Sequence, residues 1–242
     1  MQKNYIYGKN ATIEFIANFP EKVITVFTTL VDLKSKFQNH PFLTKIVNKD
    51  DLDKLLGEKN LTHQGIVLEY KQFNYTPFKD LTTKNLDNKN AFYIILDQIH
   101  DPYNFGAIIR SAVLMGVDAI ITLDHNQVEI TPTVIKASGG TAFHIDVCRV
   151  ANLGNIIKLL KEEGFWIYSS NLNEDSQNFF NVEFNTKTTL ILGNESKGVG
   201  DKITKMSDIN IHIPTLKVID SLNVSVAAGI FMFDIARKLQ KI

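Results

Sequence analysis

The sequence predicts an α/β protein of two domains, a larger one built on a parallel sheet with helices on both faces and a smaller one at the N-terminus. The first observation is a regular alternation of strands and helices from residue 91 onward, which is typical of a parallel sheet. The second is the stretch 91–96, an unbroken apolar run of the kind found in strands buried on both faces. The third is a polar stretch, 74–90, that separates this part from the first 73 residues and is interpreted as a linker.

The first 73 residues have the pattern of a small α/β unit without a catalytic constellation. His63 precedes the last expected strand and is interpreted as a solvated side chain in a turn. The expected elements are a helix over 10–17, a strand over 22–27, the end of a helix at 37–40 ahead of Pro41, and a strand over 66–70.

The larger domain, 91–242, alternates more regularly. Asn104 is expected to cap its first helix and Gly116 to end it, while Pro132 suits the first turn of the next helix. The expected strands are 91–96, 119–122, 143–148, 166–169, 188–192 and 209–212, and the expected helices lie near 104–115, 131–139, 152–163 and 201–206.

A final helix is expected to open at Ser221, a good N-cap residue. Its start gathers small polar side chains beside free backbone N–H groups, which suits a polar or anionic ligand, although a capped core helix explains the same pattern. Both faces are apolar, so burial on most sides is expected. One face carries Leu222, Val226, Gly229, Ile230 and Phe233, and the other carries Val224, Ala227, Phe231 and Ile235.

Composition and charge exclude several classes of protein. With 44% hydrophobic and 21% charged residues the chain is expected to be globular, and no apolar run approaches the roughly 18 residues of a membrane span. The N-terminus lacks the apolar core of a signal peptide, so a cytoplasmic location is expected. Basic and acidic residues balance at 26 each, so any contact with RNA must be local. Only Arg110, Arg149 and Arg237 are arginines, which favours roles for their planar forks.

Metal and disulfide chemistry is not indicated. The single cysteine, Cys148, lies in an apolar stretch and is expected to be a buried thiol. The six histidines are scattered without metal-ligand spacing, so no metal is expected.

Three loops are expected at the carboxyl ends of strands: 97–110, 193–200 and 213–223. In the first, Arg110 lies on the second turn of its helix, and its side chain is expected to lean back over the loop, although a surface ion pair would explain it equally. The second contains three glycines but neither G-x-x-x-x-G-K-[ST] nor G-x-G-x-x-G, which argues against nucleotide hydrolases and dinucleotide oxidoreductases. G-x-S-x-G and H-E-x-x-H are also absent.

The contents of these loops carry a family resemblance. The loops contain three groups of motif residues: 101–112 (Asp-Pro-Tyr-Asn-Phe-Gly through Arg-Ser-Ala), 192–198 (Leu-Gly-Asn-Glu-Ser-Lys-Gly), and the pair 213–214 and 221–225 (Ile-Pro, then Ser-Leu-Asn-Val-Ser). In order and spacing they resemble the three motifs of the SpoU (TrmH-type) RNA ribose 2′-O-methyltransferases of the SPOUT superfamily. The resemblance covers essentially all of 91–242. The first domain, with Tyr-Gly-Lys-Asn-Ala at 7–11 and His-Gln-Gly-Ile at 63–66, is similar to the small L30e-like substrate-binding domain of the member that methylates a guanosine of 23S ribosomal RNA.

The resemblance implies a transferase that uses S-adenosylmethionine as methyl donor and functions in RNA methylation and rRNA processing. It also implies a C-terminal trefoil knot, an exception to the usual rules of chain connection, and a homodimer that covers the second face of the final helix. Arg110 is implied to act at the hydroxyl, as a clamp on phosphate and alkoxide in preference to a base, because a guanidinium stays protonated. The other implied catalytic residues are Asn104, Glu195, Ser221 and Asn223, and the implied cofactor-binding residues are Leu192, Gly193, Asn194, Gly198, Ile213, Pro214, Ser221, Leu222 and Asn223.

Two departures and three alternatives stay open. Asn194 stands where the family commonly has alanine or serine, and the first domain is poor in arginine, which leaves the RNA target open. The alternatives are a tRNA guanosine 2′-O-methyltransferase of the same family, a non-catalytic RNA-binding α/β protein, and a nucleotide-dependent oxidoreductase.

Overall fold

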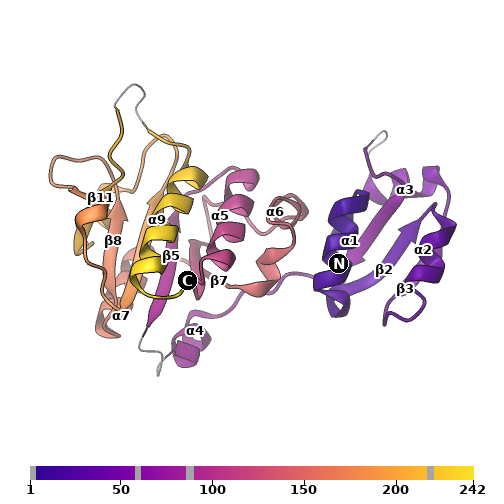
Figure 1. The fold of residues 1–242 in the computed structure, drawn as a ribbon, viewed down its shortest axis with the longest axis horizontal. Helices are drawn as coiled ribbons and strands as arrows, with labels where there is room; N and C mark the ends of the chain where they lie inside the picture. The colour runs from indigo at the N-terminus through magenta and orange to yellow at the C-terminus, as the bar shows by residue number, and fades with distance from the viewer. Residues whose placement is uncertain (1–3, 58–60, 86–89, 217–220) are drawn as a thin grey trace.

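The computed structural model describes residues 4–57, 61–85, 90–216 and 221–242 and contains two separate sheets (Figure 1). The N-terminal sheet has the strand order β1-β4-β2-β3, in which β1 and β2 run antiparallel to β4 and β3 runs parallel to β2. Its strands are β1 (Asn4–Tyr7), β2 (Val23–Thr28), β3 (Leu43–Ile46) and β4 (Ile66–Tyr70), and its helices are α1 (Lys9–Asn18), the short 3₁₀ turn η1 (Pro20–Lys22), α2 (Val31–Lys36) and α3 (Lys49–Leu56).

Three predictions in this part need correction. The helix expected to end at 37–40 ends at Lys36, and the strands β1 and β3 and the helix α3 are not among the expected elements. His63 is buried, at 4% exposure, and not solvated. Its Nδ1 accepts a hydrogen bond from the backbone nitrogen of Gly65 (3.0 Å), and its Nε2 lies 3.5 Å from Asp53 Oδ1, so the ring holds the turn from inside.

The segment that connects the two sheets is structured where it is described. It contains helix α4 (Phe78–Asn85), whose Leu81 is fully buried against the large sheet. Thr76 and Lys84 both bind the carboxylate of Asp146, at 2.7 Å and 2.9 Å. Burial opposes ionisation of Asp146, but these two hydrogen bonds and the charge of Lys84 outweigh it, so the pKa of the carboxyl is lowered.

The second sheet contains seven parallel strands in the order β7-β6-β5-β10-β8-β11-β9, as the alternation of elements predicts. The strand expected over 143–148 begins only at Asp146, because 141–144 form the 3₁₀ turn η2, and the two-residue strand β9 is not an expected element. The strands are β5 (Ala91–Asp97), β6 (Ala119–Leu123), β7 (Asp146–Val150), β8 (Trp166–Ser170), β9 (Gln177–Asn178), β10 (Lys187–Gly193) and β11 (Ile209–His212). The helical elements are α5 (Pro102–Leu114), α6 (Pro132–Ala137), η2 (Thr141–His144), α7 (Leu153–Glu162), η3 (Phe179–Asn181), α8 (Asp201–Thr204) and α9 (Val224–Lys238).

Helices cover both faces of this sheet, as Figure 1 shows. Successive residues of a strand point to opposite faces, so Phe92 and Ile94 of β5 join the core under α5 and α9, whereas Tyr93 and Ile95 join the core under α4 and α7. Every residue of β5 is buried, as the unbroken apolar run predicts.

Cys148 on β7 is fully buried, which confirms the prediction of a buried thiol. Burial, and then the charge of Asp146, raises the pKa of the thiol to about 11. The thiol therefore stays protonated and unreactive near neutral pH.

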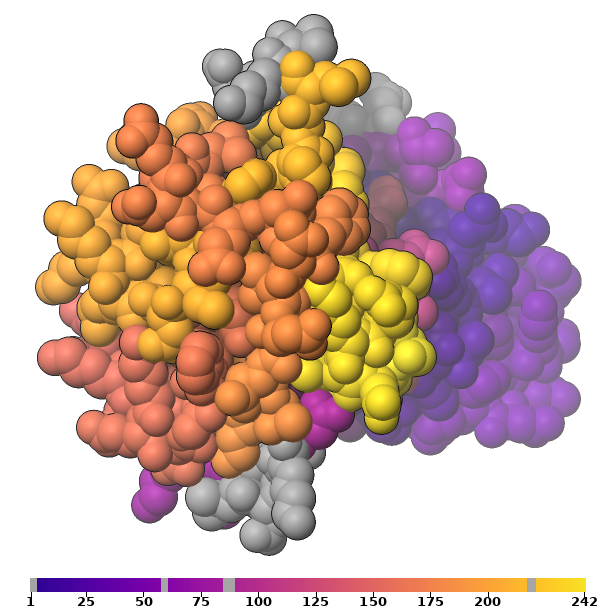
Figure 2. Space-filling model, turned by 60° about the vertical axis from the view of Figure 1, so that its left-hand side comes forward, coloured from indigo at the N-terminus to yellow at the C-terminus, as the bar shows by residue number. Residues whose placement is uncertain are grey.

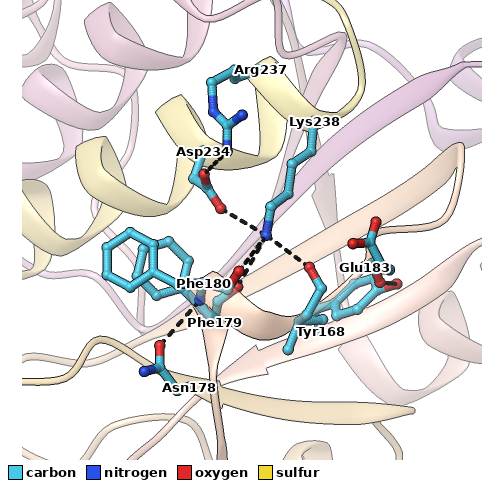
Figure 3. A network of polar contacts seen from close by, with 9 residues as sticks. Tyr168, Asn178, Phe179, Phe180, Glu183, Asp234, Arg237 and Lys238 are labelled. Carbon is cyan, nitrogen blue, oxygen red and sulfur yellow. Dashed lines mark hydrogen bonds and ion pairs between the residues drawn. The ribbon is translucent and has the colours of Figure 1, made fainter.

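The end of α9 is fixed by a polar network (Figure 3). Lys238 Nζ donates to the backbone carbonyls of Phe179, Phe180 and Val182 at 3.4, 3.0 and 2.9 Å, and it lies 3.1 Å from Asp234 Oδ2. Asp234 is buried within the stretch expected to be apolar, and Arg237 pairs with its other oxygen at 2.7 Å. These contacts tie the last turn of the helix to η3.

An aromatic cluster joins the small N-terminal domain to the larger domain. Phe143, from η2, has its ring centroid 5.4 Å from the rings of both Phe15 and Phe19 and 5.5 Å from that of Phe73. Tyr70 completes the cluster at 6.1 Å from Phe143. The small domain is therefore packed against the larger one, and more than a linker connects them.

Candidate functional site

Four loops meet at the carboxyl edge of the large sheet because of its strand order. β10 lies between β5 and β8, and β11 lies beside β8, all in parallel. The segments that follow these strands therefore emerge next to one another, where parallel α/β sheets bind ligands. Three of them are the loops predicted from the sequence, although 217–220 of the third lie outside the described residues.

Gly193, at the end of β10, packs directly against the backbone of the loop that follows it. A Cβ on Gly193 would lie 2.1 Å from the carbonyl carbon of Gly198 and 2.2 Å from the nitrogen of Val199, far inside contact distance. Because both neighbours are backbone atoms, no side-chain rotation relieves the overlap. Only glycine fits at this position.

Asn194 builds the loop that follows. Its backbone pairs with Gly198 in both directions, at 3.1 and 2.8 Å. Its side-chain Oδ1 accepts hydrogen bonds from the backbone nitrogens of Ser196 and Lys197, and its Nδ2 donates to the carbonyl of Gln98 at 2.9 Å. Alanine has no such amide, so this departure from the common family residue adds a tie between the first and second loops.

A chain of side-chain hydrogen bonds joins all three predicted loops. Asn104 Nδ2 donates to Glu195 Oε1 at 3.0 Å, and Asn223 Nδ2 donates to Asn104 Oδ1 at 3.1 Å. The free oxygen of Asn223 accepts from the backbone nitrogen and the hydroxyl of Ser225. Residues 91 and 119 positions apart in the sequence thus hold one another in fixed orientations.

Two predicted helix caps are wrong. Asp101, not Asn104, caps α5, since its Oδ1 accepts from the nitrogen of Tyr103 at 2.9 Å. Asn223, not Ser221, caps α9. The shift at α5 leaves the Asn104 side chain free for the hydrogen bonds above.

Beside this chain of hydrogen bonds lies a cavity of about 430 Å³. One part of its wall is apolar, with Leu192, Ile213 and Phe231, and the other part is polar backbone and small polar side chains. The predicted site residues that line it are Leu192, Gly193, Asn194, Glu195, Gly198, Ile213, Ser221 and Leu222. Pro214, Asn104 and Asn223 do not line it, but the last two adjoin it through Glu195.

Arg110 lies elsewhere in the single chain. The sixth residue after Asn104 is rotated by about 240° around the helix axis, since each residue turns by about 100°. Arg110 instead lines a second cavity, between α5, α6 and the small domain. The expectation that its side chain leans over the first loop is wrong for one chain by itself.

The loop after β8 is the part of the site that the sequence interpretation missed. Ser170, Asn171 and Asn173 line the larger cavity, and Asn171 is fixed by a 3.0 Å hydrogen bond to Asn210. The sequence does contain a signal for this loop, because the polar stretch Ser-Ser-Asn-Leu-Asn lies at the end of an expected strand. Among the described residues, no three His, Cys, Asp or Glu side chains are grouped to hold a metal ion, and none of the helices there has the length and apolar character of a membrane span.

Comparison with known proteins identifies the family. Residues 91–233 match the family model described as the SpoU rRNA methylase family. The chain belongs to the SpoU family. Residues 5–76 match a second model, described as RNA 2′-O ribose methyltransferase substrate binding. SpoU family membership makes the protein an RNA methyltransferase, which confirms the resemblance seen in the three loops.

Similar proteins extend over nearly the whole chain. A protein of Borreliella burgdorferi, named a tRNA/rRNA methyltransferase, is 39% identical over 220 residues, which are 88% of this chain and 94% of that protein. The crystal structure of an AdoMet-bound rRNA methyltransferase from Sinorhizobium meliloti covers 97% of this chain and 87% of its own, with a TM-score of 0.77 and 24% identity. The SpoU methyltransferase AviRb from Streptomyces viridochromogenes covers 99% of this chain and 90% of its own, with a TM-score of 0.78 and 18% identity. These likenesses confirm the SPOUT-type fold. The trefoil knot stays a prediction.

Gly193→Ala should destabilise the folded protein by about 3 kcal/mol or more, because its Cβ would overlap backbone atoms. Gly200→Ala is the matched control in the same loop: a Cβ there would lie at an ordinary 3.5 Å from Asp97, so a change within about 0.5 kcal/mol is expected. Urea unfolding followed by circular dichroism measures both. Equal stability of the two variants would contradict the tight turn.

Proposed function

We propose that this SpoU protein transfers a methyl group from S-adenosylmethionine to the ribose 2′-hydroxyl of a guanosine in 23S ribosomal RNA, in the cytoplasm. The observation that carries this proposal is the hydrogen-bonded chain Glu195–Asn104–Asn223, which joins the three motif loops beside one cavity. A non-catalytic RNA-binding protein has no need of such a cavity. We assign RNA binding to residues 1–73, the linker to 74–90 and catalysis to 91–242.

A guanosine in tRNA is the second candidate substrate. The name of the Borreliella burgdorferi relative includes both RNA classes, which keeps this candidate open. The description of the family model that matches residues 91–233 refers to rRNA and favours the first candidate.

The residues around the larger cavity fit S-adenosylmethionine. Its volume, about 430 Å³, lies in the range typical of small-molecule sites. Leu192, Ile213 and Leu222 offer apolar surface for an adenine ring, and Gly193 and Gly198 line the same cavity. The sulfonium group supplies an electrophilic methyl when bound.

The protein's own contribution to the reaction is to position the ribose and to stabilise the charge that develops on it. The ribose hydroxyl must approach the methyl in line, so a fixed orientation supplies much of the acceleration. Asn104 and Glu195 orient the ribose, while Ser221 and Asn223 hold the substrate and the cofactor loop. Arg110 binds the target phosphate through its planar fork and stabilises the developing alkoxide, while the proton of the hydroxyl passes to solvent water.

We further propose that the working unit is a homodimer. Val224, Phe231 and Ile235 of α9 are buried on the chain's own sheet, but Val226 and Phe233 are 51% and 52% exposed on the other face. Figure 2 shows this helix open at the surface. A contiguous apolar face of this kind is rare on monomers.

The neighbouring helix α5 extends the apolar face and places Arg110 on it. Tyr103 and Leu114 are 67% and 64% exposed. They share one face of α5 with Arg110, at spacings of seven and four residues. A two-fold axis over this face would bring Arg110 of one subunit toward the cofactor loops of the other, which accounts for its absence from the cavity of its own chain.

Arg110→Ala should lower methyl transfer to 23S ribosomal RNA by about 100-fold or more, because a group that stabilises the developing charge is lost. Arg110→Lys should fail almost as badly, since an ammonium lacks the planar fork. S-adenosylmethionine affinity, measured by calorimetry, should change little in both variants. Arg237→Ala is the matched control and should keep its activity. A lysine variant with most of its activity would refute the clamp, and wild-type protein that does not bind S-adenosylmethionine would refute the function.

Val226→Asp and Phe233→Asp should convert the protein to an inactive monomer, because each buries a charge at the centre of the proposed interface. Leu159→Asp is the control, since Leu159 is 43% exposed on α7, on the opposite face of the sheet. Sedimentation equilibrium at micromolar concentration gives the mass. A fully active wild-type monomer would contradict the dimer.

A further inference from the structure

A second cavity, of about 370 Å³, lies between the two domains. β1, α1 and the loop before β4 form one wall, and α5, α6 and the turn at Gly139 and Gly140 form the other. The aromatic cluster around Phe143 packs the same two domains together, so both walls belong to one docked arrangement.

The wall from the larger domain is cationic. Arg110 and Lys136 line it, and the small domain adds one carboxylate, Glu14. A Cβ on Gly139 would lie 3.2 Å from both Arg110 Nη1 and Glu14 Oε1, so the absence of a side chain leaves room for these groups. Arg110 makes no hydrogen bond or ion pair within the described part of the chain. Lys136 Nζ lies 4.6 Å from the centroid of the Tyr7 ring, a cation–π contact.

The wall from the small domain presents an oriented amide. Gln64 has φ of 52°, a conformation uncommon outside glycine, and its Oε1 accepts a 2.8 Å hydrogen bond from the nitrogen of Lys9. The buried ring of His63 holds the same turn through Gly65. Strain of this kind persists where the surroundings fix it, often at ligand sites. The amide nitrogen of Gln64, which has no partner among the described residues, is left to donate into the cavity.

We propose that this interdomain cavity binds one RNA nucleotide adjoining the methylation site, with its phosphate on Lys136 and its base edge on the amide of Gln64. A cation, an aromatic ring and an amide match the phosphate, stacking face and polar edge of a nucleotide. The wall that carries Gln64 belongs to the segment that matches a substrate-binding family. The inference rests on the proposed function, because the ligand is a part of the same RNA substrate.

Lys136 is tested through the salt dependence of RNA binding. The affinity of the full-length protein for an unmodified 23S ribosomal RNA transcript is measured by filter binding across a series of salt concentrations. Lys136→Ala should reduce the slope of log Kd against log salt by about 0.7 to 0.9, the value for one lost phosphate contact. Lys158→Ala, an exposed lysine on α7, should leave the slope unchanged.

Gln64 is tested by kinetics. Gln64→Ala should raise KM for the transcript about five- to tenfold, the loss of one hydrogen bond, with little change in kcat or in S-adenosylmethionine affinity. Gln38→Ala, in the same domain and exposed, is the control. Thermal melting of each variant verifies that it is folded.

The outcomes separate the two proposals. The proposed nucleotide site is supported if the salt slope falls for Lys136→Ala but not for Lys158→Ala, and if KM rises for Gln64→Ala. The cavity proposal is overturned if Lys136→Ala has the salt slope, and Gln64→Ala the KM, of the wild type and the controls. This holds even where methyl transfer proceeds. Wild-type protein that binds the transcript through Lys136 but transfers no methyl group overturns the proposed function and leaves the cavity as an RNA site.

Discussion

The hydrogen bonds among Glu195, Asn104 and Asn223 are the interaction on which the site depends. Each residue comes from a different loop, and each loop follows a different strand of the parallel sheet or opens a helix that packs on it. The middle residue is available only because Asp101 caps α5 in its place. The first loop is further tied to the second by Asn194, whose amide reaches the carbonyl of Gln98.

The large sheet was predictable because its signals are local and strong. The run 91–96 has no polar residue that would place it at an edge, and Pro132 and Gly116 mark helix ends in the usual way. The same locality explains the errors at the caps. Asp101 and Asn104, or Ser221 and Asn223, are equally suited to cap a helix, and the hydrogen bonds that decide between them involve residues far away in the sequence.

The position of Arg110 and the orientation of α9 depend on packing that the sequence pattern does not contain. A helix that is apolar on two faces gives no sign of which face meets its own sheet, and only the packing of Phe231 and Ile235 decides it. Arg110 lies toward Gly139 because α6 and the small domain dock beside α5. Burial of His63 likewise results from helix α3, which supplies Asp53 and is not among the expected elements.

Helix α5 separates two cavities with different chemistry. Near its start, Asn104 adjoins the cavity that fits a methyl donor, and two turns later Arg110 enters the cavity between the domains. In the proposed dimer, α5 would therefore serve the methyl-donor cavity of its own chain through Asn104 and that of the partner subunit through Arg110.

The most direct test of the central claim is a map of ribose methylation in ribosomal and transfer RNA from cells with and without the gene. The account predicts that one 2′-O-methyl group on a guanosine of 23S ribosomal RNA disappears without the gene and returns with the wild-type protein. Unchanged methylation at every ribosomal position, or loss confined to a tRNA, would contradict it.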